Sequence, residues 1–160
     1  MILDERLEFL DATALNTGAA ATYLIGDVID TGPLGNAAQG VTVLNSDLAG
    51  GADSLYLVVG VDTAATSGGA ATLQIQLASD AQAAIATDGS ATVHFASAVI
   101  PVASLVAGFY VARVMLPIGT YERYLGILQI TGAFAFTAGK LNAFLTNDVA
   151  AYRVYADAVN

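Results

Sequence analysis

Apolar and polar residues alternate with a period of two along several short segments of this chain. In residues 71–77 the apolar side carries Leu73, Ile75 and Leu77, and the opposite side carries Thr72, Gln74 and Gln76. Residues 91–97 and 140–146 follow the same pattern. This periodicity is typical of β-strands that bury one face, so it restricts the chain to folds built from sheets.

Three other segments are apolar on both sides, namely residues 55–61, 109–116 and 124–130. Glycine-rich and proline-containing turns separate the strand segments, while helical patterns are confined to residues 79–86, with Ser79 as a cap, and 101–108. The sequence therefore predicts a single all-β domain over residues 1–160. The expected fold is an antiparallel β-sandwich of jelly-roll type with at most short helical turns.

Charged residues make up only 12% of the 160 residues, and hydrophobic residues make up 56%. Soluble domains usually contain about 25% charged residues, so part of this surface is expected to be covered. The longest apolar run, residues 99–112, is interrupted by Pro101 and Gly108 and is shorter than the ~20 residues of a membrane helix. The first residues are acidic and do not resemble a signal peptide. We therefore expect protein partners and no membrane.

The chain has fourteen acidic and five basic residues, with a formal net charge of −9. The five bases are scattered along the sequence, whereas binding to nucleic acid depends mainly on clustered Lys and Arg. Nucleic acid is therefore not an expected partner. The absence of cysteine excludes disulfides, thiol catalysis and thiolate metal sites.

The sequence contains no pattern typical of catalysis or of cofactor binding. His94 is the only histidine and lies on the polar side of a predicted strand, where a hydrogen-bonded surface role is expected. The acidic residues lack the spacing of a calcium loop, and the Gly139-Lys140 pair is not followed by the Ser or Thr of a phosphate loop. We therefore expect no enzyme, no metal and no cofactor.

Several segments, taken in order, resemble one known family. They are "LYLVVGVDTAATSGGAATLQIQL", "SAVIPVASLVAGF", "LPIGTYERYLGILQITG", "FTAGKLNAFLT" and "AYRVYA", and the opening "MILDERLEFLDA" adds to them. This series is similar to the jelly-roll capsid cement, or decoration, proteins of tailed bacteriophages. The resemblance implies a structural virion protein, made in the bacterial cytoplasm, that binds the outer surface of the icosahedral head. Such a protein bridges neighbouring major capsid proteins and stabilises the shell against the pressure of its DNA.

Tyrosine and arginine are enriched at interface hot spots, and the chain has two clusters of them. We predict an assembly interface with the major capsid protein, or within a dimer or trimer of this chain. The first 11 residues are predicted either to form an arm on a neighbour or to be the first strand of this chain's own sandwich. The candidate interface residues are Ile2, Leu3, Leu7, Tyr121, Arg123, Tyr124, Tyr152, Arg153 and Tyr155.

Two other functions stay open at the level of sequence. One is a jelly-roll module on the virion that binds carbohydrate or a host surface, although the chain has no tryptophan to stack on a sugar. The other is a small β-sandwich enzyme, which would have to use His94 or the loop acids.

Overall fold

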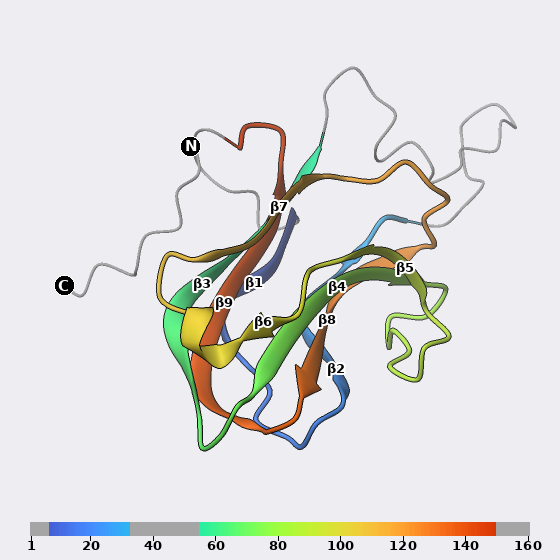
Figure 1. Cartoon of the computed structure of the whole chain (residues 1–160). Helices are drawn as coiled ribbons and strands as arrows, with labels where there is room; N and C mark the ends of the chain where they lie inside the picture. Colours follow the sequence, from blue (N-terminus) through green and yellow to red (C-terminus); the bar gives the residue numbers. More distant parts are fainter. Residues whose placement is uncertain (1–6, 33–54, 150–160) are drawn as a thin grey trace, which may run out of the picture.

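The computed structural model describes residues 7–32 and 55–149, and these residues form two antiparallel β-sheets packed face to face (Figure 1). Sheet A has the strand order β1-β9-β3-β7, and sheet B has the order β2-β8-β4-β5, with the short β6 also paired to β4. The strands are β1 (Glu8–Ala14), β2 (Thr22–Asp30), β3 (Tyr56–Ser67), β4 (Thr72–Asp80), β5 (Thr92–Ala96), β6 (Ile100–Pro101), β7 (Tyr110–Met115), β8 (Tyr124–Gly132) and β9 (Phe136–Thr146).

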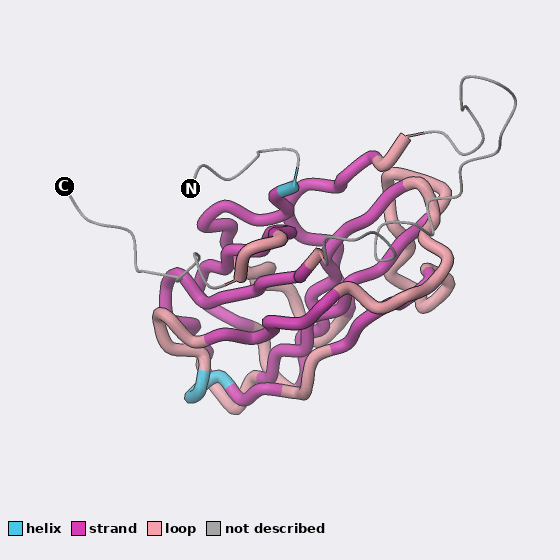
Figure 2. Tube along the Cα trace, turned by 90° about the horizontal axis from the view of Figure 1, so that it is seen from above, coloured by secondary structure: helices cyan, strands magenta, loops and turns pink. Residues whose placement is uncertain are grey.

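The order of the strands is that of a jelly roll. The chain passes from one sheet to the other between β1 and β2, β2 and β3, β3 and β4, β6 and β7, β7 and β8, and β8 and β9. The two sheets lie on either side of one core. The helical part of the described chain is short, as Figure 2 shows, and includes the 3-10 helix Val102–Ser104. The predicted fold is therefore confirmed.

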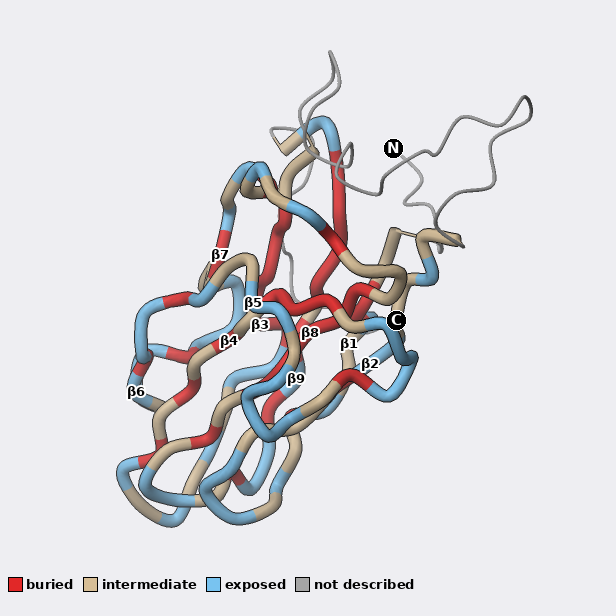
Figure 3. Tube along the Cα trace, turned by 90° about the vertical axis from the view of Figure 1, so that its right-hand side faces the viewer, coloured by how far each residue is buried: buried red, intermediate tan, exposed pale blue. Residues whose placement is uncertain are grey.

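The core lies between the sheets and consists of the side chains on the inward faces of the strands. Leu73, Ile75 and Leu77 of β4 have no exposed surface and belong to this core, whereas Gln74 and Gln76 on the opposite side are half-buried. Figure 3 shows buried stretches along the strands and exposed residues in the turns that join them. The alternation in the sequence thus gives the correct inward face of β4.

The outer face of sheet B is also apolar around β8, and a loop of the same chain covers it. Ile85, in the loop between β4 and β5, is 3% exposed and packs with Leu128, Leu24 and Val28. Gly126 leaves room for it, since a Cβ at this position would come within 2.6 Å of Ile85 Cδ1. Part of the outward-facing apolar surface of residues 124–130 is therefore covered by the chain itself.

The loop that carries Ile85 is not the helical turn that the sequence predicts. Ser79 does not cap it, because its hydroxyl contacts His94 Nε2 and accepts a hydrogen bond from the Glu122 amide. The next residue, Asp80, holds the loop instead: its carboxylate accepts hydrogen bonds from the amides of Gln82 at 3.1 Å and Ala86 at 3.0 Å. These bonds lower the pKa of Asp80 below its usual value, that of Ala86 contributing most.

Of the two alternatives for the first 11 residues, the described part of this segment supports the first strand of the sandwich. Residues 8–11 begin β1, which pairs with β9 in sheet A, and Leu10 has no exposed surface. Leu7 packs against the same core. Gly26 of β2, at φ +70°, allows β2 to pass close to β1, because a Cβ there would lie 2.2 Å from the carbonyl oxygen of Phe9. This segment is thus built into the sandwich, and residues 1–6 lie outside the described residues.

Candidate assembly interface

The loop between β7 and β8, residues 116–123, lies at one end of the sandwich and contains most of the predicted interface cluster. Its central anchor is Tyr121, whose side chain is completely buried. The Tyr121 hydroxyl donates a hydrogen bond to the carbonyl oxygen of Pro117 at 2.6 Å. Its ring stacks on His94 with 3.9 Å between ring centroids. Burial raises the pKa of the Tyr121 hydroxyl above its usual value. Tyr121 therefore closes the loop on itself and fixes it to β5.

A second anchor joins this loop to sheet B through Ser79. The Ser79 hydroxyl lies 2.7 Å from His94 Nε2 and accepts a hydrogen bond from the Glu122 amide at 3.0 Å. The Glu122 carboxylate in turn accepts a hydrogen bond from the Thr92 hydroxyl at 2.7 Å. Burial lowers the pKa of His94, and the nearby Glu122 carboxylate partly opposes this shift. The loop is thus attached to β4 and β5 by a continuous set of polar contacts.

The far end of the loop is attached to β2 by an ion pair. Arg123 Nε and Nη2 each donate to one oxygen of the Asp30 carboxylate at 2.8 Å, which is the bidentate geometry. The Arg123 hydrogen bond and the amide of Gly32 together lower the pKa of Asp30 to about 2. Thr31 also donates to the Arg123 carbonyl oxygen through its amide at 2.9 Å and its hydroxyl at 2.7 Å. The Arg123 guanidinium lies 4.9 Å from the centre of the Tyr124 ring, so both side chains are held in place.

One large apolar side chain of the loop is exposed. Ile118, between Pro117 and Gly119, is 83% exposed. The Arg123 side chain is 39% exposed, and Tyr124 is half-buried. A fixed loop that presents an isoleucine and an arginine, with a tyrosine directly after it, has the chemistry of a protein contact. We call these residues, Ile118, Arg123 and Tyr124, the loop surface.

The loop surface differs in one respect from the interface that the sequence predicts. Tyr121 is not available to a partner, because its ring and hydroxyl are used inside the protomer. Arg123 and Tyr124 are brought together as predicted. Ile118 was missed, although "PIGT" places an apolar residue directly between a proline and a glycine in a turn, where it has few neighbours. Leu7 lies against the core, and the other predicted residues, Ile2, Leu3, Tyr152, Arg153 and Tyr155, lie outside the described residues.

Ser79 and His94 have the residue types of a nucleophile and its base, but their surroundings do not suit catalysis. Ser79 has no exposed surface, so a substrate would not reach its hydroxyl. His94 is hydrogen-bonded, as the sequence suggests, with Nε2 directed at Ser79 and the ring against Tyr121. In residues 7–32 and 55–149 no group of three or more His, Asp or Glu side chains is arranged to hold a metal ion. We therefore place no catalytic or metal site in this cluster.

A groove lies on the outer face of sheet B, beside the loop that carries Ile85, and it does not have the lining of a carbohydrate site. Its volume is about 220 Å³, and the residues that line it include no aromatic ring on which a sugar could stack. Those residues are Thr22, Gln76, Ala86, Thr87, Gly89, Ala91, Val93, Leu128 and Ile130.

Among the described residues, no helix has the length and hydrophobicity needed to span a membrane.

No curated protein matches this chain. A family match, in contrast, extends over residues 9–145, from the second residue of β1 to the penultimate residue of β9. The match includes every strand of both sheets and the whole β7–β8 loop. The chain therefore belongs to the Bbp16 family.

Proposed function

We propose that this protein is a structural component of a bacteriophage virion that binds the outer surface of the icosahedral head. In this role it bridges neighbouring major capsid proteins and stabilises the shell against internal DNA pressure. The observation that carries the proposal is the loop surface, an exposed isoleucine on a loop fixed at both ends to the sandwich. The ordered segments that resemble cement proteins indicate which partner such a surface would contact.

A fixed loop is suited to this work because it loses little conformational entropy on binding. Tyr121, Ser79 and the Asp30–Arg123 ion pair already hold the backbone of residues 117–123, so a partner need not order it. Preorganisation of this kind increases affinity without increasing the contact area. The net charge of −9 also favours the outside of a DNA container, away from the packed phosphates.

The stabilising mechanism is multivalent binding. A specific contact buries roughly 800 Å² on each partner, and one such contact can be weak. A protein that contacts two capsid subunits raises the free energy needed to separate them, because both contacts must be lost together. Binding only to the assembled shell then stabilises the shell by mass action.

The proposal is tested with purified protein and cognate empty shells, by co-sedimentation and by the temperature at which the shells disrupt. The wild-type chain is expected to bind and to raise that temperature. Ile118→Asp should weaken binding about tenfold or more, since it puts a charge into the contact. Val99→Asp is the matched control, because Val99 is 60% exposed and lies near the start of β4, away from the loop surface.

Two results would contradict the proposal. The first is no co-sedimentation of the wild-type protein at micromolar concentration. The second is an equal loss of binding for Ile118→Asp and Val99→Asp, which would mean that the loop surface is not the contact.

A further inference from the structure

A bulge in β5 directs the only histidine of the chain towards the β7–β8 loop. The register of β4 with β5 shifts between Leu77 and Ala78, which lie opposite Phe95 and Val93, so His94 has no partner in the ladder. An extra residue of this kind bends the strand and redirects a side chain. The His94 ring therefore meets the loop, although simple alternation along β5 would place it on the polar side of the strand.

The Ser79 hydroxyl joins this ring to the loop, and its hydrogen bonds identify which atoms carry protons. Ser79 has no exposed surface. Its oxygen accepts a hydrogen bond from the Glu122 amide at 3.0 Å and lies 2.7 Å from His94 Nε2, and among the described residues these are its two partners. Because an amide N–H only donates, the hydroxyl hydrogen has one acceptor, which is Nε2. His94 is then neutral, with its own proton on Nδ1.

Protonation of His94 removes that acceptor. In the imidazolium ion both ring nitrogens carry a hydrogen, so Nε2 and the Glu122 amide both donate to the Ser79 oxygen and the hydroxyl hydrogen has no acceptor. A buried donor without an acceptor is unfavourable. Ser79 cannot move away, because it is paired on both sides, with Leu125 of β8 and Thr92 of β5. The loop backbone at Glu122 lies outside the strands and is the part that can move and admit water.

The groups around His94 set the pH at which this change occurs. Burial lowers the pKa of His94, and the Glu122 carboxylate on the loop partly opposes this shift. The Tyr121 hydroxyl on the same loop stays uncharged at neutral pH, since burial raises its pKa further. From β4 the ring meets the uncharged Ser79 hydroxyl, and from its own strand the Thr92 hydroxyl is donated to Glu122.

We propose that the Ser79–His94 pair is a pH-sensitive switch: neutral His94 holds the β7–β8 loop against β4, and protonated His94 releases the loop at Glu122. The release is local, because the Tyr121 hydroxyl bond and the Asp30–Arg123 ion pair do not involve His94 Nε2 and persist in both states. The released residue lies directly before Arg123, so the switch controls how rigidly the loop surface is held. This inference does not rest on the function proposed above, and its test uses the full-length chain alone.

The protonation state of His94 can be read directly, because no other histidine contributes signals. Long-range ¹H–¹⁵N correlation spectra of the untagged, ¹⁵N-labelled protein at pH 8 are expected to show a protonated Nδ1 and an unprotonated Nε2. Titration to lower pH should then protonate Nε2. A neutral ring with its proton on Nε2 at pH 8 would overturn the proposal, because the Ser79 hydroxyl would not be using Nε2 as its acceptor.

Hydrogen exchange at the Glu122 amide tests the release itself. Its protection factor, which corrects the exchange rate for the direct effect of pH, is expected to fall about tenfold as His94 becomes protonated. The Thr31 amide is the internal control, because it donates to the Arg123 carbonyl oxygen at the far end of the loop and should keep its protection. Constant protection of the Glu122 amide through the titration of His94, or an equal fall at both amides, would overturn the proposal.

Two variants identify the group that titrates. His94→Gln keeps a side chain that can accept from the Ser79 hydroxyl but gains no charge, so the protection of the Glu122 amide should no longer depend on pH. Glu122→Gln removes the carboxylate that favours protonated His94, so the fall should persist and move to lower pH together with the titration of the ring. A fall that persists in His94→Gln, or one that disappears in Glu122→Gln while His94 still titrates, would overturn the proposal. The tautomer measurement needs no variant, so it decides the matter even if His94→Gln does not fold.

Discussion

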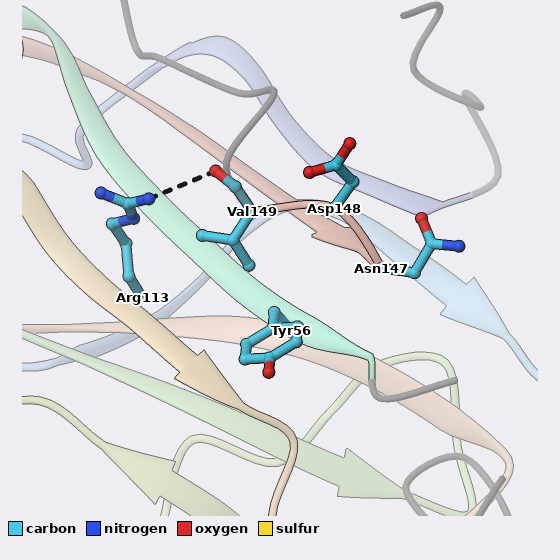
Figure 4. Close-up of a pocket in the computed structure, with 5 residues that line it drawn as sticks. All are labelled: Tyr56, Arg113, Asn147, Asp148 and Val149. Atoms are coloured by element: carbon cyan, nitrogen blue, oxygen red, sulfur yellow. Dashed lines mark hydrogen bonds between the residues drawn. The ribbon is translucent and has the colours of Figure 1, made fainter. Parts of the chain in front are cut away.

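Both sheets carry buried apolar side chains on their outer faces, and the two faces are covered in different ways. On sheet B, the apolar surface around Gly126 and Leu128 is covered by Ile85, which comes from the loop between two consecutive strands of that sheet. On sheet A, Val58 and Phe144 alternate with core residues, so they face outward, and both are buried. The chain returns across β3 after its last strand, where Arg113 of β7 donates to the Val149 carbonyl oxygen (Figure 4). The cover of sheet B is local in sequence, whereas the chain that crosses sheet A follows the last strand of the sandwich. A low share of charged residues therefore does not by itself require a partner, because the chain can cover part of its own apolar surface.

The largest expected effect is on the cover of sheet B. Ile85→Ala should reduce the free energy of unfolding by about 2–5 kcal/mol, because it removes buried methyl and methylene groups from a site that cannot fully collapse. Urea denaturation measures the change. The control Val93→Ala removes an apolar side chain that is 45% exposed, and its effect should be below about 1 kcal/mol. Equal effects would mean that Ile85 does not cover the sheet.

The next effect concerns the cover of sheet A. Val58→Ala should cost about 2 kcal/mol if its outward side chain is as well packed as it is buried. The same measurement on Phe144→Ala and on the double variant gives a coupling energy, because Phe144 lies opposite Val58 in the register of β3 and β9. If the two buried side chains pack on each other, the coupling should be about 0.5–1 kcal/mol. Strict additivity of Val58→Ala and Phe144→Ala would contradict a shared cover of this face.

A smaller effect is expected from the clamp of the sheet B loop. Asp80→Ala removes the acceptor of the Gln82 and Ala86 amides and should cost about 1 kcal/mol, as the loss of a helix cap does. Hydrogen exchange at the Ala86 amide should accelerate, while exchange in sheet A should not. The contrasting variant is Asp88→Ala, which removes a carboxylate that bonds only Ser90 among the contacts of the described residues. If Asp88→Ala accelerates exchange at Ala86 as strongly, the Asp80 clamp is not what holds the loop.

The smallest expected effect is a pH dependence of the free energy of unfolding that comes from His94 on β5. Since burial lowers the pKa of His94, the unfolded chain binds a proton more readily than the folded one. The stabilisation is fully present above the ordinary histidine pKa of about 6.5 and is lost as pH falls below it towards the folded pKa. Chemical denaturation between pH 8 and pH 5 should show this loss, and His94→Gln should remove it. An unchanged pH profile in His94→Gln would assign the dependence to other groups.

Much of the fold can be predicted from the sequence because strand patterns are local. The alternation in residues 71–77 identifies the inward face of β4, and the turn residues between segments give the strand number approximately. The sequence could not predict that Asp80, and not Ser79, holds the loop after β4. The residue at which β4 ends depends on its pairing with β8, which continues up to Tyr124. The sequence also could not separate Tyr121 from Tyr124, since one faces a histidine of β5 and the other an arginine beside it in the chain.

The sequence by itself determined the class of structure: alternating apolar residues with frequent turns leave a β-sandwich as the way to bury one face of each strand. Only the tertiary structure decided which apolar residues remain outside. Tyr121 is enclosed because β4, β5 and the β7–β8 loop meet around it, and Ile118, three residues earlier, is exposed because no described strand passes over it. Burial depends on neighbours that are distant in sequence, and no local pattern contains them.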